Sequence, residues 1–272
     1  MEQLEKRLKE VDIFVELRDA RLPISSFNKK IDDVIQSHKK TKMVVFNKWD
    51  LCEQGISSVV ADELTVLGIP NIKVSSKQRS FDFQKLLGFS RSLKIEKHST
   101  VGLWAMVGGM PNVGKSSLIN SLRVLSKSFE RNDVAKSTAK PCETTHVTGF
   151  KVCGNPLVYV VDTPGILLPS IEEQTMGLNL GLVGIIPPKI FGAQNLIKHL
   201  YDKLDAPRLD SMFKKYCFST RPKCGEDIIY LTMEAFKIKE PDNACHKILG
   251  DFQTGEFGKI TLDSVYKKIT PS

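Results

Sequence analysis

No stretch of this sequence is long and apolar enough to cross a membrane, since no apolar run approaches the roughly 18 residues that a transmembrane helix needs. Paired cysteines are also absent: the six cysteines are scattered, and no two have the C-x-x-C spacing of a zinc or redox site. Reduced thiols in an intracellular protein are the favoured interpretation. The first ten residues alternate acids and bases, which is typical of neither a signal peptide nor a transit peptide.

Charge is the first positive signal. Lysine and arginine number 39 against 31 acidic residues, which gives a formal net charge of +8. Clustered basic side chains release counterions from phosphates, so a polyanionic partner is one interpretation of this charge. A basic surface that is simply solvated is an equally good interpretation of charge alone.

The first part of the chain alternates apolar runs with amphipathic segments. Strand-like runs cover 13–17, 43–46, 71–74 and 102–107. Helical spacing occurs between them, including 83–93, and a hairpin is predicted from 147–153 and 157–161. The alternation predicts an α/β fold with a mostly parallel sheet and helices on both faces. The polar, basic segment 126–140 has no period and predicts a mobile loop.

After residue 170 the pattern changes to short helices without strands. Helices are predicted over 193–204, from Pro207 onward, over 228–236, and after Asp242, which is a good N-cap. A length of 272 residues suits one large domain and one small one. The predicted domains are therefore 1–170, the α/β domain, and 171–272, a small helical domain.

A phosphate-binding loop is the clearest motif. Residues 109–116 read G-M-P-N-V-G-K-S, which fits G-x-x-x-x-G-K-[ST], with a strand before and a helix after. Backbone N–H groups of such a loop and the start of the helix bind phosphate oxygens. Lys115 would contact the β and γ phosphates, and the Ser116 hydroxyl would bind magnesium. The loop predicts a P-loop NTPase whose nucleotide contacts are Asn112, Val113, Gly114, Lys115, Ser116 and Ser117.

The base is selected by another motif, N-K-W-D at 47–50, at the carboxyl end of the 43–46 strand. The Asp50 carboxylate can accept from the guanine ring N–H and exocyclic amine together, whereas adenine offers no such pair. Asn47 and Lys48 can brace the base and the loop. These residues predict GTP and GDP as ligands and argue against an ATP-using kinase.

Three further segments complete the predicted site. D-T-P-G follows the 157–161 strand, so Asp162 is placed to hold Mg²⁺, through a water, and the Gly165 N–H to reach the γ-phosphate. Thr144 or Thr145 could supply a second hydroxyl to the metal, and Thr144 is favoured over a merely solvated threonine. Ser75, Ser76 and Lys77 can line the base, although this tripeptide is the least specific signal.

The motif order is unusual, because N-K-W-D precedes the phosphate loop instead of following it. A parallel sheet keeps its site when the old termini are joined and the chain is cut elsewhere. The order therefore predicts a circularly permuted GTP-binding domain. Its γ-phosphate-sensing segment after Gly165 would run directly into the helical domain.

In this order the motifs resemble the circularly permuted ribosome-assembly GTPases of the YlqF/RbgA type, as do D-A-R-L-P at 19–23 and D-F-Q-T at 251–254. The runs at 116–123 and 155–157 are similar to mitochondrial members of that group. The resemblance implies a GTPase of low intrinsic rate that matures the large ribosomal subunit through rRNA contacts of its helical domain. It also implies a mitochondrial location, with a cytoplasmic one as the alternative, because a targeting segment is not in this sequence.

Departures from that family pattern matter for catalysis. Thr144 is preceded by P-C-E instead of the usual Pro-Gly, and Ile166 stands where common GTPases carry the water-orienting glutamine. The family's Phe-Pro-Gly-His-Met element is also not in this sequence, so a missing amino-terminal segment is expected.

In GTPases that this loop resembles, the asparagine at the position of Asn112 helps to bind a monovalent cation. Lys115, Thr144 and Asn112 are therefore the catalytic candidates, with K⁺ as an additional cofactor; an Asn112 that only fits the turn is the alternative.

The partners follow from charge and resemblance. Lys198, Lys203, Lys214 and Lys215 are the candidate rRNA contacts, although they could equally form a solvated helix face. A monomer is expected, and peripheral membrane association cannot be read from the sequence. The competing function is a GTP-dependent scaffold that barely hydrolyses and binds a non-ribosomal partner. Asp19 and Arg21 are as well explained by an ion pair at a strand end as by a functional role.

Overall fold

The computed structural model describes residues 2–76, 80–81, 102–132, 149–154, 157–162, 171 and 173–264. Within these residues the chain divides into two compact units. The first contains residues 1–19, 27–49 and 59–169, and the second contains 20–26, 50–58 and 170–272. The predicted domain boundary at residue 170 stays a prediction, and the segments 20–26 and 50–58 are counted with the second unit.

A sheet of seven strands forms the first unit, in the order β4-β3-β2-β1-β5-β7-β6. Pairing is parallel from β3 to β7 and antiparallel at both edges. The strands are β1 (Ile13–Asp19), β2 (Thr41–Asn47), β3 (Asn71–Ser75), β4 (Ser80–Phe81), β5 (Leu103–Gly109), β6 (Gly149–Gly154) and β7 (Leu157–Asp162). The predicted mostly parallel sheet and the β6–β7 hairpin are confirmed.

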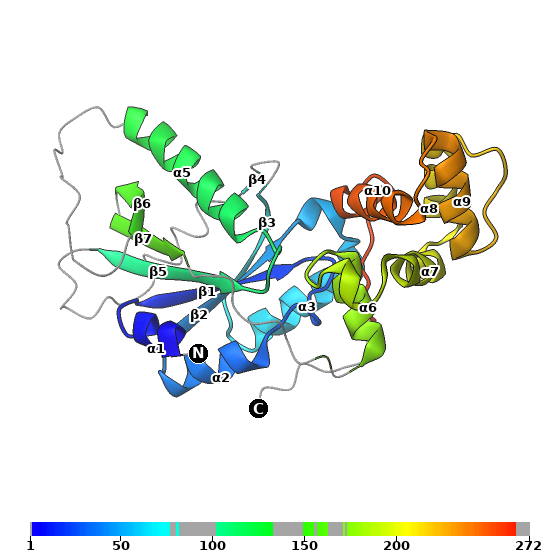
Figure 1. Ribbon diagram of the computed structural model, residues 1–272. Coiled ribbons are helices and arrows are strands. Elements are labelled where there is room, and N and C mark those ends of the chain that lie inside the picture. Colours follow the sequence, from blue (N-terminus) through cyan, green and yellow to red (C-terminus); the bar gives the residue numbers. More distant parts are fainter. Residues whose placement is uncertain are drawn as a thin grey trace. The chain divides into compact units, whose positions relative to one another are not determined.

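Helices cover both faces of this sheet (Figure 1). On one face, α1 (Glu2–Leu8) and α2 (Lys29–Ser37) bury apolar side chains against the strands, with Phe14, Met106 and Val161 in the shared core. The opposite face carries α5 (Lys115–Asn132). Asn28 begins α2 by accepting a hydrogen bond from the Ile31 N–H, which satisfies one of the free donors of the first turn.

The sequence prediction was wrong at the end of α5. A loop was predicted from residue 126, but the helix continues to Asn132. Residues 126–132 contain neither proline nor glycine, and a polar helix can extend into solvent without an apolar period. The rest of the predicted loop, 133–140, and the predicted helix 83–93 lie outside the described residues.

The second unit is helical. It contains α6 (Gln174–Leu182), η2 (Pro188–Ile190), α7 (Ala193–Lys203), α8 (Ala206–Tyr216), α9 (Gly225–Phe236) and α10 (Pro241–Thr254). Its core is formed by buried side chains such as Leu196, Ile228 and Ile248. Asp242 does not cap α10 as predicted: Glu240 is the N-cap and Pro241 occupies the first turn, where a missing N–H costs nothing.

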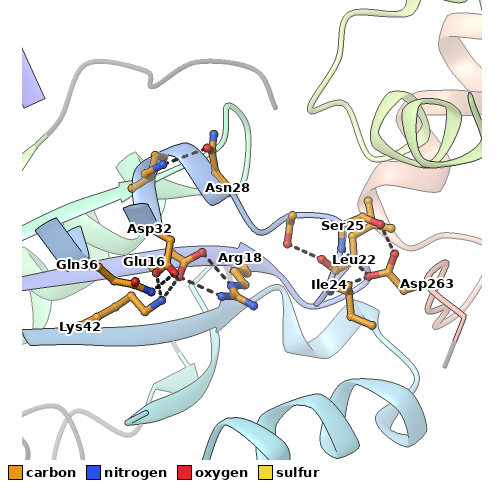
Figure 2. Close-up of polar contacts among 12 residues, drawn as sticks. Glu16, Arg18, Leu22, Ile24, Ser25, Asn28, Asp32, Gln36, Lys42 and Asp263 are labelled. Carbon is orange, nitrogen blue, oxygen red and sulfur yellow. Dashed lines mark hydrogen bonds and ion pairs between the residues drawn. The ribbon is translucent and has the colours of Figure 1, made fainter. Parts of the chain in front are cut away.

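The loop segments that belong to the second unit are held by residues 260–263. Ile260 N–H donates to Leu51 O at 3.0 Å, and Leu262 N–H donates to Arg21 O at 2.9 Å. The Asp263 carboxylate accepts from the Ile24 and Ser25 N–H groups at 2.7 and 3.0 Å, as Figure 2 shows. Segments that follow β1 and β2 in the chain are therefore ordered by hydrogen bonds to residues more than 200 positions away.

Candidate nucleotide-binding site

The phosphate loop leaves β5 and enters α5, as the sequence predicted. Gly114 has φ +100°, and a Cβ at this position would overlap Asn47 Nδ2. Glycine is therefore required by both the backbone conformation and the neighbouring side chain. Lys115 Nζ donates to Gly109 O at 3.1 Å and to Met110 O at 2.8 Å, so the lysine folds back over the loop. Ser116 and Ser117 are exposed in the first turn of α5, where backbone donors are open to an anion.

Asn47 joins the base motif to two other segments. It ends β2 and is 2% exposed. Its Nδ2 donates to Val113 O at 2.8 Å, and its Oδ1 accepts from Ser76 N–H at 3.1 Å and Ser76 Oγ at 2.8 Å. One buried amide thus uses both its donor and its acceptor to connect three motifs that are distant in sequence.

Lys48 provides a second connection to the phosphate loop. Its Nζ donates to Asn112 O at 2.9 Å. Lys48 and Asn112 both have left-handed backbone, with φ of 60° and 56°. Such a conformation costs a non-glycine residue roughly 1–2 kcal/mol, which surrounding contacts must offset.

Ser76 also accepts a hydrogen bond from a residue of α5 that sequence reasoning missed. Ser121, buried on α5, donates its hydroxyl to Ser76 O at 2.8 Å. Ser75 and Ser76 are themselves buried, at 6% and 5% exposed. A polar residue on the inner face of a predicted helix was the available signal, because buried hydroxyls need a partner.

Of the remaining predicted residues, the structure describes Asp50 and the backbone of Asp162. Asp50 lies half-buried in the short helix η1 (Trp49–Leu51), in the segment counted with the second unit. Asp162 ends β7 and pairs with Val107 of β5, which places its backbone beside the strand that leads to the phosphate loop. The predicted contacts Lys77, Thr144 and Gly165 lie outside the described residues, as does the alternative Thr145.

Magnesium suits the donor that is described. The Ser116 hydroxyl, in the first turn of α5, is a hard oxygen ligand of the kind that this ion prefers. Within the described residues, no cluster of three His, Cys, Asp or Glu side chains forms a separate metal site.

Comparison with known proteins shows the family of the chain. A family model described as a 50S ribosome-binding GTPase matches residues 105–221, which include the phosphate loop. Ribosome biogenesis GTPase A of Priestia megaterium is 31% identical over 96% of this chain and 92% of its own length. The chain belongs to this GTPase family. It therefore binds guanine nucleotides and hydrolyses GTP.

Other relatives agree over nearly the whole chain. Mitochondrial ribosome-associated GTPase 1 of Mus musculus is 28% identical over 97% of this chain and 86% of its own length. The crystal structure of GNP-bound YlqF from T. maritima has the same fold, with a TM-score of 0.67 at 19% identity and 97% coverage of both chains. The resemblance predicted from the order of the motifs is confirmed, including the circularly permuted GTPase fold.

Proposed function

We propose that this GTPase assembles the large ribosomal subunit, and that the mitochondrial ribosome is the one it serves. The names of its relatives support this proposal: ribosome biogenesis GTPase A and mitochondrial ribosome-associated GTPase 1. The description of the family model, a 50S ribosome-binding GTPase, supports the choice of the large subunit. Family membership favours a hydrolysing enzyme over a scaffold that barely hydrolyses.

The observation that carries the nucleotide site is the connection made by Asn47. Because this residue bonds Val113 O and Ser76, the base motif and the phosphate loop are parts of one arrangement. We assign guanine contact to Asp50 and phosphate contact to the loop. The complete proposed set is Asn47, Lys48, Asp50, Ser75, Ser76, Lys77, Asn112, Val113, Gly114, Lys115, Ser116, Ser117 and Gly165.

The proposed chemistry assigns a role to each part of the site. Loop N–H groups and Lys115 bind the phosphates, and Ser116, Thr144 and Asp162 hold Mg²⁺. When bound, magnesium neutralises charge on the phosphate oxygens. The described helices contain none long and apolar enough to span a membrane. We place rRNA binding in the helical unit, where Lys203 and Lys214 are the leading candidates.

Sedimentation of the tagged protein with ribosomal particles tests the proposal. The protein should travel with mitochondrial large subunits when a non-hydrolysable GTP analogue is present and leave them with GDP. Lys115→Ala is the matched control, since it should lose the nucleotide dependence. Single-turnover GTP hydrolysis should accelerate when large subunits are added. Co-sedimentation with small subunits only, or equal hydrolysis with and without particles, would reject the ribosomal role.

A further inference from the structure

Asp19 is buried at the carboxyl end of the parallel strands, where the nucleotide motifs also lie. It is the last residue of β1 and pairs in register with Asn47, the last residue of β2. Its side chain is fully buried, and Oδ2 lies 2.9 Å from Lys48 Nζ. A buried carboxylate is costly unless it is paired, so this ion pair requires the lysine to stay in place.

Lys48 transmits that constraint to the phosphate loop. The same Nζ that faces Asp19 donates to Asn112 O at 2.9 Å. An ammonium has three donors, so it can satisfy both oxygens at once. Asp19, Lys48 and Asn112 thus form a chain of charge-assisted contacts from β1 through the base motif to the loop.

We propose that Asp19 is a positioning residue for the nucleotide site. It acts through Lys48 on the backbone of the phosphate loop, and its effect is to slow nucleotide release. The inference rests on the proposed nucleotide site. Its physical basis is that Lys48 and Asn112 both hold left-handed backbone, which local contacts must maintain while the nucleotide is bound. Without the buried anion, the ammonium would gain more from water than from the Asn112 carbonyl.

The same strand offers a matched control. Glu16 is also a buried carboxylate of β1, with Arg18 Nε at 3.0 Å and Lys42 Nζ at 3.6 Å. Figure 2 shows this cluster together with Asp32 and Gln36 of α2. The Glu16 carboxylate contacts Arg18 and Lys42, neither of which belongs to a nucleotide motif. Glu16→Gln therefore removes a buried charge from β1 without touching the nucleotide motifs.

The experiment measures release of a fluorescent GDP analogue from the whole chain after an excess of unlabelled GDP is added. Asp19→Asn should release the analogue roughly tenfold faster than wild type, because a charge-assisted contact is lost and affinity changes appear mainly in dissociation rates. Glu16→Gln should release it at the wild-type rate, even though both variants lose stability. Equal rates for Asp19→Asn and wild type would overturn the assignment.

A double variant shows whether Asp19 acts through Lys48. Lys48→Met should release the analogue faster than Glu16→Gln, and Asp19→Asn combined with Lys48→Met should be no faster than Lys48→Met alone. Multiplicative rates would contradict the proposed path through the lysine. These two variants also supply the test if Asp19→Asn alone does not fold. Failure of wild type to bind the analogue would reject the nucleotide site itself, whereas the Asp19 results concern the positioning role only.

Discussion

Asp50 is the residue on which guanine selection depends in the proposed site. Asp50→Asn replaces one of the two carboxylate acceptors with an amide donor that would face a guanine donor, so we expect GTP affinity to fall roughly tenfold to a hundredfold. Xanthosine triphosphate should then bind better than GTP, since its base can donate to and accept from an amide. Titration of the variant with each nucleotide measures the ratio of the two affinities. Asp62→Asn, an exposed change on α3 (Gln54–Val66), is the control, and an unchanged GTP preference in Asp50→Asn would refute the assignment.

The second prediction concerns Asn112 and the monovalent cation proposed to support GTP hydrolysis. Its side chain is exposed on the phosphate loop, and its backbone is held by Lys48. A cation bound there would neutralise charge that develops between the β and γ phosphates. We expect faster hydrolysis in potassium than in sodium at matched ionic strength, and Asn112→Ala should remove most of the difference while GTP still binds. Equal wild-type rates in the two salts would leave Asn112 as a residue that only fits the turn.

The four lysines proposed to contact rRNA lie on two helices of the second unit, and they differ in whether a carboxylate is paired with them. Lys198 of α7 pairs with Glu226 at 2.6 Å, and this contact raises the pKa of Lys198. Lys215 of α8 pairs with Glu256. Within the described residues, Lys203 and Lys214 form no ion pair, and Lys214 is exposed. When a lysine binds a phosphate, it releases counterions from the nucleic acid. A lysine that is already paired with a carboxylate releases fewer of these counterions than an unpaired one.

The resulting prediction compares two neighbours on α8. Lys214→Ala should reduce the log–log salt slope of rRNA binding by about 0.7–0.9, the value of one phosphate contact. Lys215→Ala should reduce it by less, because its ammonium is already paired with a carboxylate. Binding measured between low and physiological salt gives both slopes. A salt-independent affinity would indicate a protein partner instead of RNA.

His199 of α7 predicts a pH dependence of stability. Its Nε2 lies 2.8 Å from Asn179 Oδ1 of α6, and Asn179 Nδ2 donates to Leu262 O. Burial lowers the pKa of His199, Lys203 lowers it further, and Asp202 opposes them. The unfolded chain therefore binds a proton first as pH falls. This contribution to stability is complete above the usual pKa near 6.5 and is lost as pH falls through the lower folded value.

The measurement is the denaturant midpoint at about pH 7.5 and about pH 5.5. Wild type should lose more stability on acidification than His199→Gln, whose side chain can still donate to Asn179. If both proteins respond equally to pH, His199 is not the group responsible.

For the whole molecule, nucleotide binding should stabilise the folded chain by mass action. GDP at about 100 times its dissociation constant should add about 2.7 kcal/mol to the free energy of unfolding. Gly114→Ala should abolish this increase, because the added methyl group overlaps Asn47 Nδ2. Denaturation with and without GDP and magnesium measures the difference. A GDP-dependent increase that survives in Gly114→Ala would show that the loop glycine is dispensable.

Local patterns in the sequence were enough to predict the fold class, the guanine nucleotide and the family. Gly114, Lys115 and Ser116 act through their own loop and helix, and the alternation of strands and helices predicts a parallel sheet whatever the distant contacts are. The same local reasoning failed where the pattern had no period, at residues 126–132 of α5. It also placed the cap of α10 at Asp242, whereas the structure has Glu240 there, because capping depends on backbone geometry.

The contacts that join these motifs could not be predicted from local patterns. Asn47, Ser76 and Val113 are far apart in the chain and meet through one buried amide. The sequence explains Asp19 equally well by an ion pair at a strand end and by a functional role, and only the fold brings its carboxylate to 2.9 Å from Lys48 Nζ. A hydrogen bond forms only when its donor and acceptor lie within about 3 Å of one another. Which distant residues come within that distance is set by strand order and register, which no local pattern in the sequence contains.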